Sequence, residues 1–124
     1  MKEIKAHGFA EFMKIVSSDD LKGKAIFCLF SGDKDANGKS WCPDCVVSEP
    51  VVRSSLDQLD DPDAVFVYCA VGGREYWKDQ RNEFRQNLKL TGVPTLMKWG
   101  KPNQKLVEKE IKADLIAMML ESED

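Results

Sequence analysis

Hydrophobic and polar residues alternate in some stretches of the chain and recur at helical spacing in others. Residues 2–7, KEIKAH, alternate as a short, half-exposed strand does. Two unbroken apolar runs, KAIFCLF at residues 24–30 and AVFVYCAV at residues 64–71, are typical of strands covered on both faces. Residues 95–100 and 105–109 flank the turn-forming KPN and predict an antiparallel hairpin.

Other stretches place apolar residues every three or four positions, which predicts amphipathic helices. The first such helix covers residues 8–18, and a second begins at the cysteines of WCPDC and bends at Pro50. Residues 74–90 predict a third helix and residues 111–120 a fourth. The third helix carries three large apolar residues on one face: Trp77, Phe84 and Leu88. The final residues, ESED, are expected to be a solvated chain end.

The order of these elements predicts an α/β fold. Strands that alternate with helices in the first part of the chain predict parallel strands joined by crossover helices, and the hairpin adds antiparallel strands. The sequence contains no internal repeat, linker or low-complexity segment that would divide it. We therefore predict a single domain, residues 1–124, with a central mixed five-stranded sheet flanked by about four helices on both faces.

Composition and charge narrow the classes of function. A length of 124 residues is enough for one buried core, and a net charge of −3 with a pI near 5.2 gives no electrostatic argument for nucleic acid. No apolar run is long enough to span a bilayer, and MKEIKAHGF lacks the apolar segment of a signal peptide. We expect a cytosolic protein without a membrane or nucleic-acid partner.

The chain has four cysteines, of which only Cys42 and Cys45 form a close pair, in KSWCPDC. Such a pair is half of a zinc site, a structural disulfide or a redox-active dithiol. A structural zinc site needs four Cys or His ligands, but Cys28 and Cys69 lie in predicted strands and His7 is the only histidine. A static disulfide is not expected in a reducing compartment. We therefore expect a dithiol without a metal, and we expect the other two cysteines to pack as small apolar side chains.

The start of a helix suits a reactive thiol, because unpaired N–H groups and the positive end of the helix dipole favour a thiolate there. We expect Cys42 to be the nucleophile and Cys45, one turn further on, to resolve the mixed disulfide. Pro43 suits the first helical turn. Asp44 places a like charge beside the thiolate, so we expect it to raise the pKa of Cys42 and to make the pair more reducing. Alternatively, Asp44 is only a helix-start residue.

Further landmarks accompany this pair. WCPDC opens a helix after a buried strand, Pro50 follows Cys45 by five residues, and GVPT precedes the hairpin. In this order, the landmarks resemble the thioredoxin fold. GKSWCPDC, EPVVR and YWKD together resemble the small thioredoxin-related proteins of 14 kDa, the thioredoxin domain-containing protein 17 or Clot family. The likeness spans essentially the whole chain.

The resemblance implies a disulfide reductase recharged by NADPH through a flavin-containing thioredoxin reductase, with no bound cofactor of its own. It also implies denitrosylation and slow peroxide removal by the same dithiol. Pro94 would be cis beside the dithiol, and Val93 would offer backbone groups that pair with an extended segment of the substrate. We expect Trp41 to flank the nucleophile in the same docking surface. A bend at Pro94 and a packing role of Trp41 are the plainer alternatives.

The sequence departs from ordinary thioredoxins at three places. Cys28 stands where those proteins carry a buried Asp that is thought to deprotonate the resolving cysteine. The sequence therefore does not identify the group that takes the proton from Cys45. Residues 31–40 and 72–84 are longer than the corresponding thioredoxin segments, and we expect them to narrow access to the dithiol and to change its substrates. Their charged residues can equally be solvated loop charges: Lys34, Asp35, Lys39 and Arg74.

Two other functions are kept open. The resemblance includes association with a dynein light chain, which would make the protein a binding adaptor in redox signalling whose thiols are incidental. A glutaredoxin-like protein would draw electrons from glutathione, but the segment after Pro94 lacks the usual Gly-Gly and acidic pattern that holds glutathione. An exposed dithiol also favours a working monomer.

Overall fold

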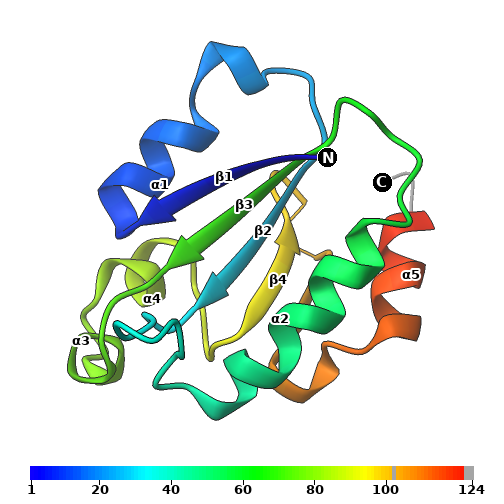
Figure 1. Cartoon of the computed structure of the whole chain (residues 1–124). Coiled ribbons are helices and arrows are strands. Elements are labelled where there is room, and N and C mark those ends of the chain that lie inside the picture. The colour runs from blue at the N-terminus through cyan, green and yellow to red at the C-terminus, as the bar shows by residue number, and fades with distance from the viewer. Residues whose placement is uncertain (102, 122–124) are drawn as a thin grey trace.

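The computed structural model describes residues 1–101 and 103–121. Its centre is a five-stranded sheet with the strand order β1-β3-β2-β4-β5 (Figure 1). The strands are β1 (Lys2–His7), β2 (Ile26–Ser31), β3 (Val65–Ala70), β4 (Thr95–Lys98) and β5 (Lys105–Val107). The first three run parallel to one another, whereas β4 is antiparallel to both β2 and β5. The predicted mixed sheet is therefore confirmed.

Helices cover both faces of this sheet (Figure 1). They are α1 (Phe9–Val16), α2 (Pro43–Leu56), α3 (Arg74–Lys78), α4 (Glu83–Asn87) and α5 (Ala113–Glu121), with short 3-10 turns at Asp19–Leu21 and Glu108–Glu110. Buried residues of α1, α3 and α4 belong to one core cluster, and those of α2 from Val52 onward and of α5 belong to a second. Pro102 of the hairpin turn and the last three residues of the expected solvated end lie outside the described residues.

The two clusters explain why β2 is an unbroken apolar run. Cys28 and Phe30 contribute to the cluster under α1, and the alternate residues Phe27 and Leu29 contribute to the cluster under α2 and α5. Every residue of β2 is buried, because a strand in the middle of a sheet with both faces covered has no solvated side. On the α1 side the Phe12 and Phe30 rings meet edge to face, with 4.9 Å between their centroids.

The prediction of one continuous helix over residues 74–90 is wrong, because the structure has two short helices there, α3 and α4. Asn82 causes the break. Its side-chain oxygen accepts a hydrogen bond from Arg85 N (3.0 Å), and its side-chain nitrogen donates to the carbonyl oxygens of Trp77 (2.9 Å) and Asp79 (3.0 Å). Asn82 therefore begins α4 and satisfies carbonyl groups at the end of α3. Trp77 and Phe84 are buried in the same cluster, as their spacing predicted.

Candidate active site

The cysteine pair lies at the start of α2, at the end of the sheet where β2 and β3 finish (Figure 1). Cys42 is the N-cap residue of α2 with an extended backbone (φ −95°, ψ 108°), and Pro43 occupies the first turn, where its missing N–H leaves no unmet hydrogen bond. The Cys42 Sγ accepts a hydrogen bond from the backbone N–H of Cys45 at 3.2 Å. The helix start thus directs a donor and its dipole at the Cys42 sulfur.

Cys42 and Cys45 are joined as a disulfide, with their Cα atoms 5.2 Å apart. The backbone N–H of Gly32, just beyond β2, points at the Cys45 Sγ with an N···S distance of 3.5 Å. Cys42 is 5% exposed and Cys45 2% exposed. The pair is therefore less exposed than the sequence led us to expect, and Cys45 is the more shielded of the two.

The loop before β4 closes over the other side of the pair. The peptide bond between Val93 and Pro94 is cis, which agrees with what the resemblance implied. The carbonyl oxygen of Val93 lies 3.6 Å from the Cys42 Sγ. The Thr95 hydroxyl donates to the Gly92 carbonyl oxygen at 2.6 Å and so fixes the turn that carries these residues. The fold therefore brings the loop at residues 93–94 next to the Cys42 sulfur, although the two lie far apart in the sequence.

Ser40 is a site residue that was not predicted from the sequence. Its hydroxyl donates to the Gly32 carbonyl oxygen at 2.8 Å and accepts from the Cys42 N–H at 3.1 Å. Ser40 therefore fixes the turn that enters the cysteine pair. A serine two residues before the first cysteine was the only signal in the sequence, and its partner Gly32 cannot be found from local spacing.

Trp41 lies half-buried between the two longer segments. Its indole Nε1–H donates to the Gly72 carbonyl oxygen at 2.9 Å, and its own carbonyl oxygen accepts from the Arg74 guanidinium at 3.2 Å. Gly32 lies against the ring, because a Cβ at that position would come within 2.6 Å of Trp41 Cε2. The sequence predicted Trp41 beside the nucleophile, but it did not indicate the three contacts of Trp41 with Gly32, Gly72 and Arg74.

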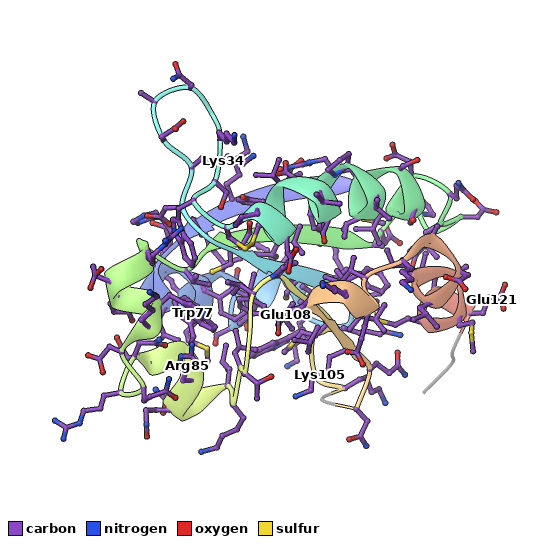
Figure 2. The ribbon with its side chains drawn as sticks, turned by 90° about the horizontal axis from the view of Figure 1, so that it is seen from below. Lys34, Trp77, Arg85, Lys105, Glu108 and Glu121 are labelled. Carbon is purple, nitrogen blue, oxygen red and sulfur yellow. A yellow bond between two sulfur atoms is a disulfide. The ribbon has the colours of Figure 1, made fainter. Side chains whose placement is uncertain are left out.

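Residues 31–40 form a projecting loop next to α2, with Lys34 near its base (Figure 2). The Lys34 ammonium pairs with Glu49 of α2 at 2.8 Å, and Glu49 also pairs with Arg53 at 2.9 Å. Arg53 in turn contacts both carboxylate oxygens of Glu3 on β1, at 2.6 and 3.1 Å. This chain of charges, which we call the Lys34–Glu3 network, ties the loop, α2 and β1 together. A cavity of about 340 Å³ separates the loop from α2.

The network changes the ionisation of its carboxylates. Burial alone would raise the pKa of Glu49, but hydrogen bonds from Lys34 and Arg53 outweigh it and hold that pKa below the usual 4.5. The hydrogen bond from Arg53 likewise lowers the pKa of Glu3, against a smaller opposing effect of burial. Both carboxylates are therefore charged at neutral pH.

Asp44 lies half-buried in the first turn of α2, directly after the exposed Pro43. This position places its carboxylate within the same turn as the Cys42 sulfur, as the sequence predicted. Whether it tunes the Cys42 thiolate stays a prediction.

The two remaining cysteines are free and buried in the sheet. Burial raises the pKa of Cys69 to about 12, with smaller contributions from Asp33 and Glu11, and burial also raises the pKa of Cys28. Thiols of this kind are inert, in agreement with the packing role expected for them. In the described part of the chain, no group of three His, Cys, Asp or Glu side chains is placed to hold a metal ion. None of the helices described here is long and apolar enough to cross a membrane.

Comparison with known proteins gives matches over nearly the whole chain. The family described as "Thioredoxin domain-containing protein 17-like, thioredoxin domain" matches residues 5–122. Thioredoxin domain-containing protein 17 of Danio rerio is 60% identical over 119 residues, which cover 95% of this chain and 94% of the relative. The Homo sapiens protein of the same name is 53% identical over 124 residues, covering 99% and 97%.

More distant likenesses are consistent with these. The thioredoxin-like protein Clot of Oryza sativa subsp. japonica is 37% identical over 97 residues, covering 73% of this chain and 70% of Clot. Among solved structures, a chloroplastic thioredoxin z superposes with a TM-score of 0.58 at 18% identity, covering 97% of this chain and 92% of that chain. At that identity the superposition shows that the two proteins share the thioredoxin fold.

Proposed function

Because the chain belongs to the thioredoxin domain-containing protein 17 family of the thioredoxin superfamily, we propose that it is a thiol–disulfide oxidoreductase that reduces disulfides with Cys42 and Cys45. Membership of this family supports a thiol oxidoreductase role in general. The observation that carries the proposal is the Cys42 sulfur at the start of α2, bonded to Cys45 and next to the Val93 carbonyl oxygen.

The proposed reaction begins with the reduced pair. The Cys42 thiolate attacks one sulfur of the substrate disulfide, forms a mixed disulfide and releases the other substrate sulfur as a thiolate, which takes up a proton. The Cys45 thiol then loses its proton and attacks the Cys42 Sγ. This step forms the Cys42–Cys45 bond and releases the second substrate thiol. Two electrons pass from the protein to the substrate.

The backbone supplies what each step needs. The Cys45 N–H that points at the Cys42 sulfur stabilises the attacking thiolate, and the Gly32 N–H that points at the Cys45 sulfur stabilises the resolving thiolate. Cys28, which replaces the buried Asp of ordinary thioredoxins, stays protonated because burial raises its pKa, and so it cannot accept the proton of Cys45. We therefore assign the proton of Cys45 to solvent.

Substrate binding is assigned to the groups around Cys42. The backbone of Val93 next to the cis proline offers a carbonyl group to an extended segment of a protein substrate. We also assign Trp41 and the loop at residues 31–40 to walls beside the sulfur, because Trp41 directly precedes Cys42 and Ser40 of the loop accepts the Cys42 N–H. These walls support a narrower choice of disulfides than a flat site would give, among exposed protein disulfides and small disulfides.

We assign the electrons to NADPH through a thioredoxin reductase, which returns the Cys42–Cys45 disulfide to the dithiol. The same dithiol would serve denitrosylation and slow peroxide removal. The proposed setting is the cytosol, where such a pair is kept reduced, and the proposed working form is a monomer.

The test is turnover of a small aromatic disulfide with NADPH and purified thioredoxin reductase. Cys42→Ser should abolish NADPH consumption, because no thiolate remains to attack. The Cys45→Ser variant should attack one substrate disulfide and then stop, because no thiol remains to resolve the mixed disulfide on Cys42. Mass spectrometry detects that mixed disulfide. Cys69→Ala is the matched control, since it removes a buried thiol outside the site, and it should keep turnover.

Three outcomes would contradict the proposal. Turnover that survives Cys42→Ser would exclude this dithiol as the reductant. Turnover with glutathione and glutathione reductase in place of thioredoxin reductase would favour the glutaredoxin-like alternative. If the wild-type protein shows no turnover with either system, the binding adaptor, for example of a dynein light chain, becomes the better reading.

A further inference from the structure

We propose that Arg74 is a positioning residue, which holds Trp41 in place beside Cys42 and thereby strengthens the binding of disulfide substrates. This inference rests on the proposed function, since it concerns the same site. Arg74 begins α3, in one of the two segments that are longer than in ordinary thioredoxins. From the sequence alone its charge could equally be a solvated loop charge.

Arg74 contacts Trp41 at two points. Its Nη2 donates to the Trp41 carbonyl oxygen at 3.2 Å, and its guanidinium carbon lies 5.6 Å from the centroid of the Trp41 ring. The first contact fixes the peptide group that leads into Cys42. The second is a cation–π contact, which fixes the face of the ring. One side chain therefore restrains both the backbone and the side chain of Trp41.

Gly72 completes the restraint from the same segment. Its carbonyl oxygen accepts the indole N–H of Trp41 at 2.9 Å, and its own N–H donates to the Asp33 carboxylate at 2.8 Å. Gly72 has a φ of +111°, which favours glycine. Residues 72–74 therefore hold the ring from a segment distant in sequence from Trp41.

The Trp41 ring also lies against Gly32. A Cβ there would come within 2.6 Å of the ring, and the N–H of Gly32 is the group that points at the Cys45 sulfur. Trp41 is thus linked to both cysteines, to Cys42 through the chain and to Cys45 through Gly32. A ring that moved would disturb the surface a substrate meets at the dithiol.

Arginine suits this role better than another cation. A planar guanidinium can stack on a ring and donate to a carbonyl at the same time, whereas an ammonium group offers only a point charge. Among the described residues, no carboxylate forms an ion pair with Arg74. The side chain is exposed, so the contacts to Trp41 are the ones that hold it.

The experiment compares Arg74→Ala with Arg74→Lys and a matched control. Arg81→Ala removes an equal charge from the same segment, at an exposed position between α3 and α4. The position of Trp41 is read by fluorine NMR of protein labelled with fluorotryptophan, with the Trp41 resonance assigned from Trp41→Phe. Substrate binding is read as KM and kcat for the disulfide-linked dimer of a short, uncharged peptide, with thioredoxin reductase and NADPH.

We expect Arg74→Ala to shift or broaden the Trp41 resonance and to raise KM about three- to tenfold, the size expected for one hydrogen bond and one exposed cation–π contact. The change in kcat should be smaller than the change in KM. Arg74→Lys keeps a hydrogen-bond donor and the positive charge but loses the planar stack on the ring. Its KM should therefore lie between that of the wild type and that of Arg74→Ala. Arg81→Ala should leave the resonance and KM as in the wild type.

The inference is overturned if Arg74→Ala leaves the Trp41 resonance or KM unchanged, or if Arg81→Ala changes both as much as Arg74→Ala does. Thermal unfolding of each variant shows whether a change comes from loss of the fold. If only Arg74→Ala loses the fold, Arg74→Lys becomes the deciding variant. Its Trp41 resonance and its KM must then differ from those of the wild type, or the inference is overturned. Failure of the proposed function looks different, because the wild-type protein itself would then show no turnover.

Discussion

The ionisation of Cys42 depends on a few groups in the first turn of α2. The Cys45 N–H and the helix start favour the thiolate, as does the Ser40 hydroxyl indirectly, by holding the Cys42 N–H in place. Asp44 is the one group in this turn that acts against them, because its carboxylate is a like charge. The balance between these groups can be tested by removing that charge alone.

Asp44→Asn should lower the pKa of Cys42 by up to about one unit, which is the size of the interaction between two charges near a protein surface. The same change should make the pair less reducing, because it stabilises the reduced, ionised form. Alkylation of the reduced protein as a function of pH measures the first effect, and equilibration with glutathione measures the second.

Asp57→Asn is the control, since it removes an equal charge at the other end of α2. It should leave both measurements as in the wild type. Unchanged values for Asp44→Asn would mean that this carboxylate only helps to start the helix.

Local sequence indicates the reactive residues but not their partners. Cys42, Pro43, Asp44 and Cys45 are recognisable because their spacing alone places them at a helix start. Gly32 contacts Cys45, Ser40 contacts Cys42, and Gly72 contacts the neighbouring Trp41. Each contact is made by a single backbone or hydroxyl group from a loop whose path the sequence does not define. A glycine that is needed for a close approach has no signature in one sequence, because any loop can contain glycine.

Among the elements, α2 is the one on which the site depends, and the Lys34–Glu3 network joins it to its neighbours. Glu49 is the central member, because it pairs with both Lys34 and Arg53. The fold lowers the pKa of Glu49, so its charge stabilises the folded protein above the usual value of 4.5. That contribution is lost as the pH falls below 4.5 and the carboxylate of the folded protein takes up a proton.

Glu49→Gln should therefore lower the free energy of unfolding by about 1 kcal/mol at neutral pH, as for a partly exposed charge network. The difference from the wild type should be smaller near pH 3 than at neutral pH, because the carboxylate takes up protons as the pH falls below 4.5. Urea unfolding at the two pH values measures this. Glu121→Gln, on the exposed side of α5 (Figure 2), is the control and should have no effect at either pH. A difference that persists at low pH would assign the loss to packing instead.

The elements themselves were predictable to different degrees. Every strand was found, because runs of apolar residues and alternation are strong signals over a few residues. The division of α3 from α4 was missed, since Trp77, Phe84 and Leu88 fit one helical face whether or not the helix is continuous. The signal was Asn82 followed by Glu83, which is the residue pair that commonly begins a helix.

On the scale of the whole molecule, the fold follows from the order of elements. Parallel β1, β3 and β2 require crossovers, and these crossovers supply the helices that bury both faces of the sheet. The result places Cys28 and Cys69 inside the sheet at 0% exposure. The reactivity of these two thiols therefore measures how often the whole fold opens, because they meet solvent only in the opened protein.

In the oxidised protein, Cys28 and Cys69 should react with iodoacetamide at least about a thousandfold more slowly than in urea-unfolded protein, because only unfolded molecules expose them. Their raised pKa values act in the same direction. The two should react at nearly equal rates, and low urea should accelerate both together. Mass spectrometry of peptide fragments gives each rate. Fast reaction of one cysteine alone would show local opening of its strand.

The projecting loop has a consequence for protein engineering. A bridge between Lys34 and Ser40 closes its base, and Ser40 and Lys34 are each anchored to the body of the protein. Its tip, at residues 36–38, is exposed. A peptide epitope or fluorescent reporter inserted at the tip would leave both anchored ends of the loop, Lys34 and Ser40, in place. It would also lie within a few residues of Cys42 along the chain.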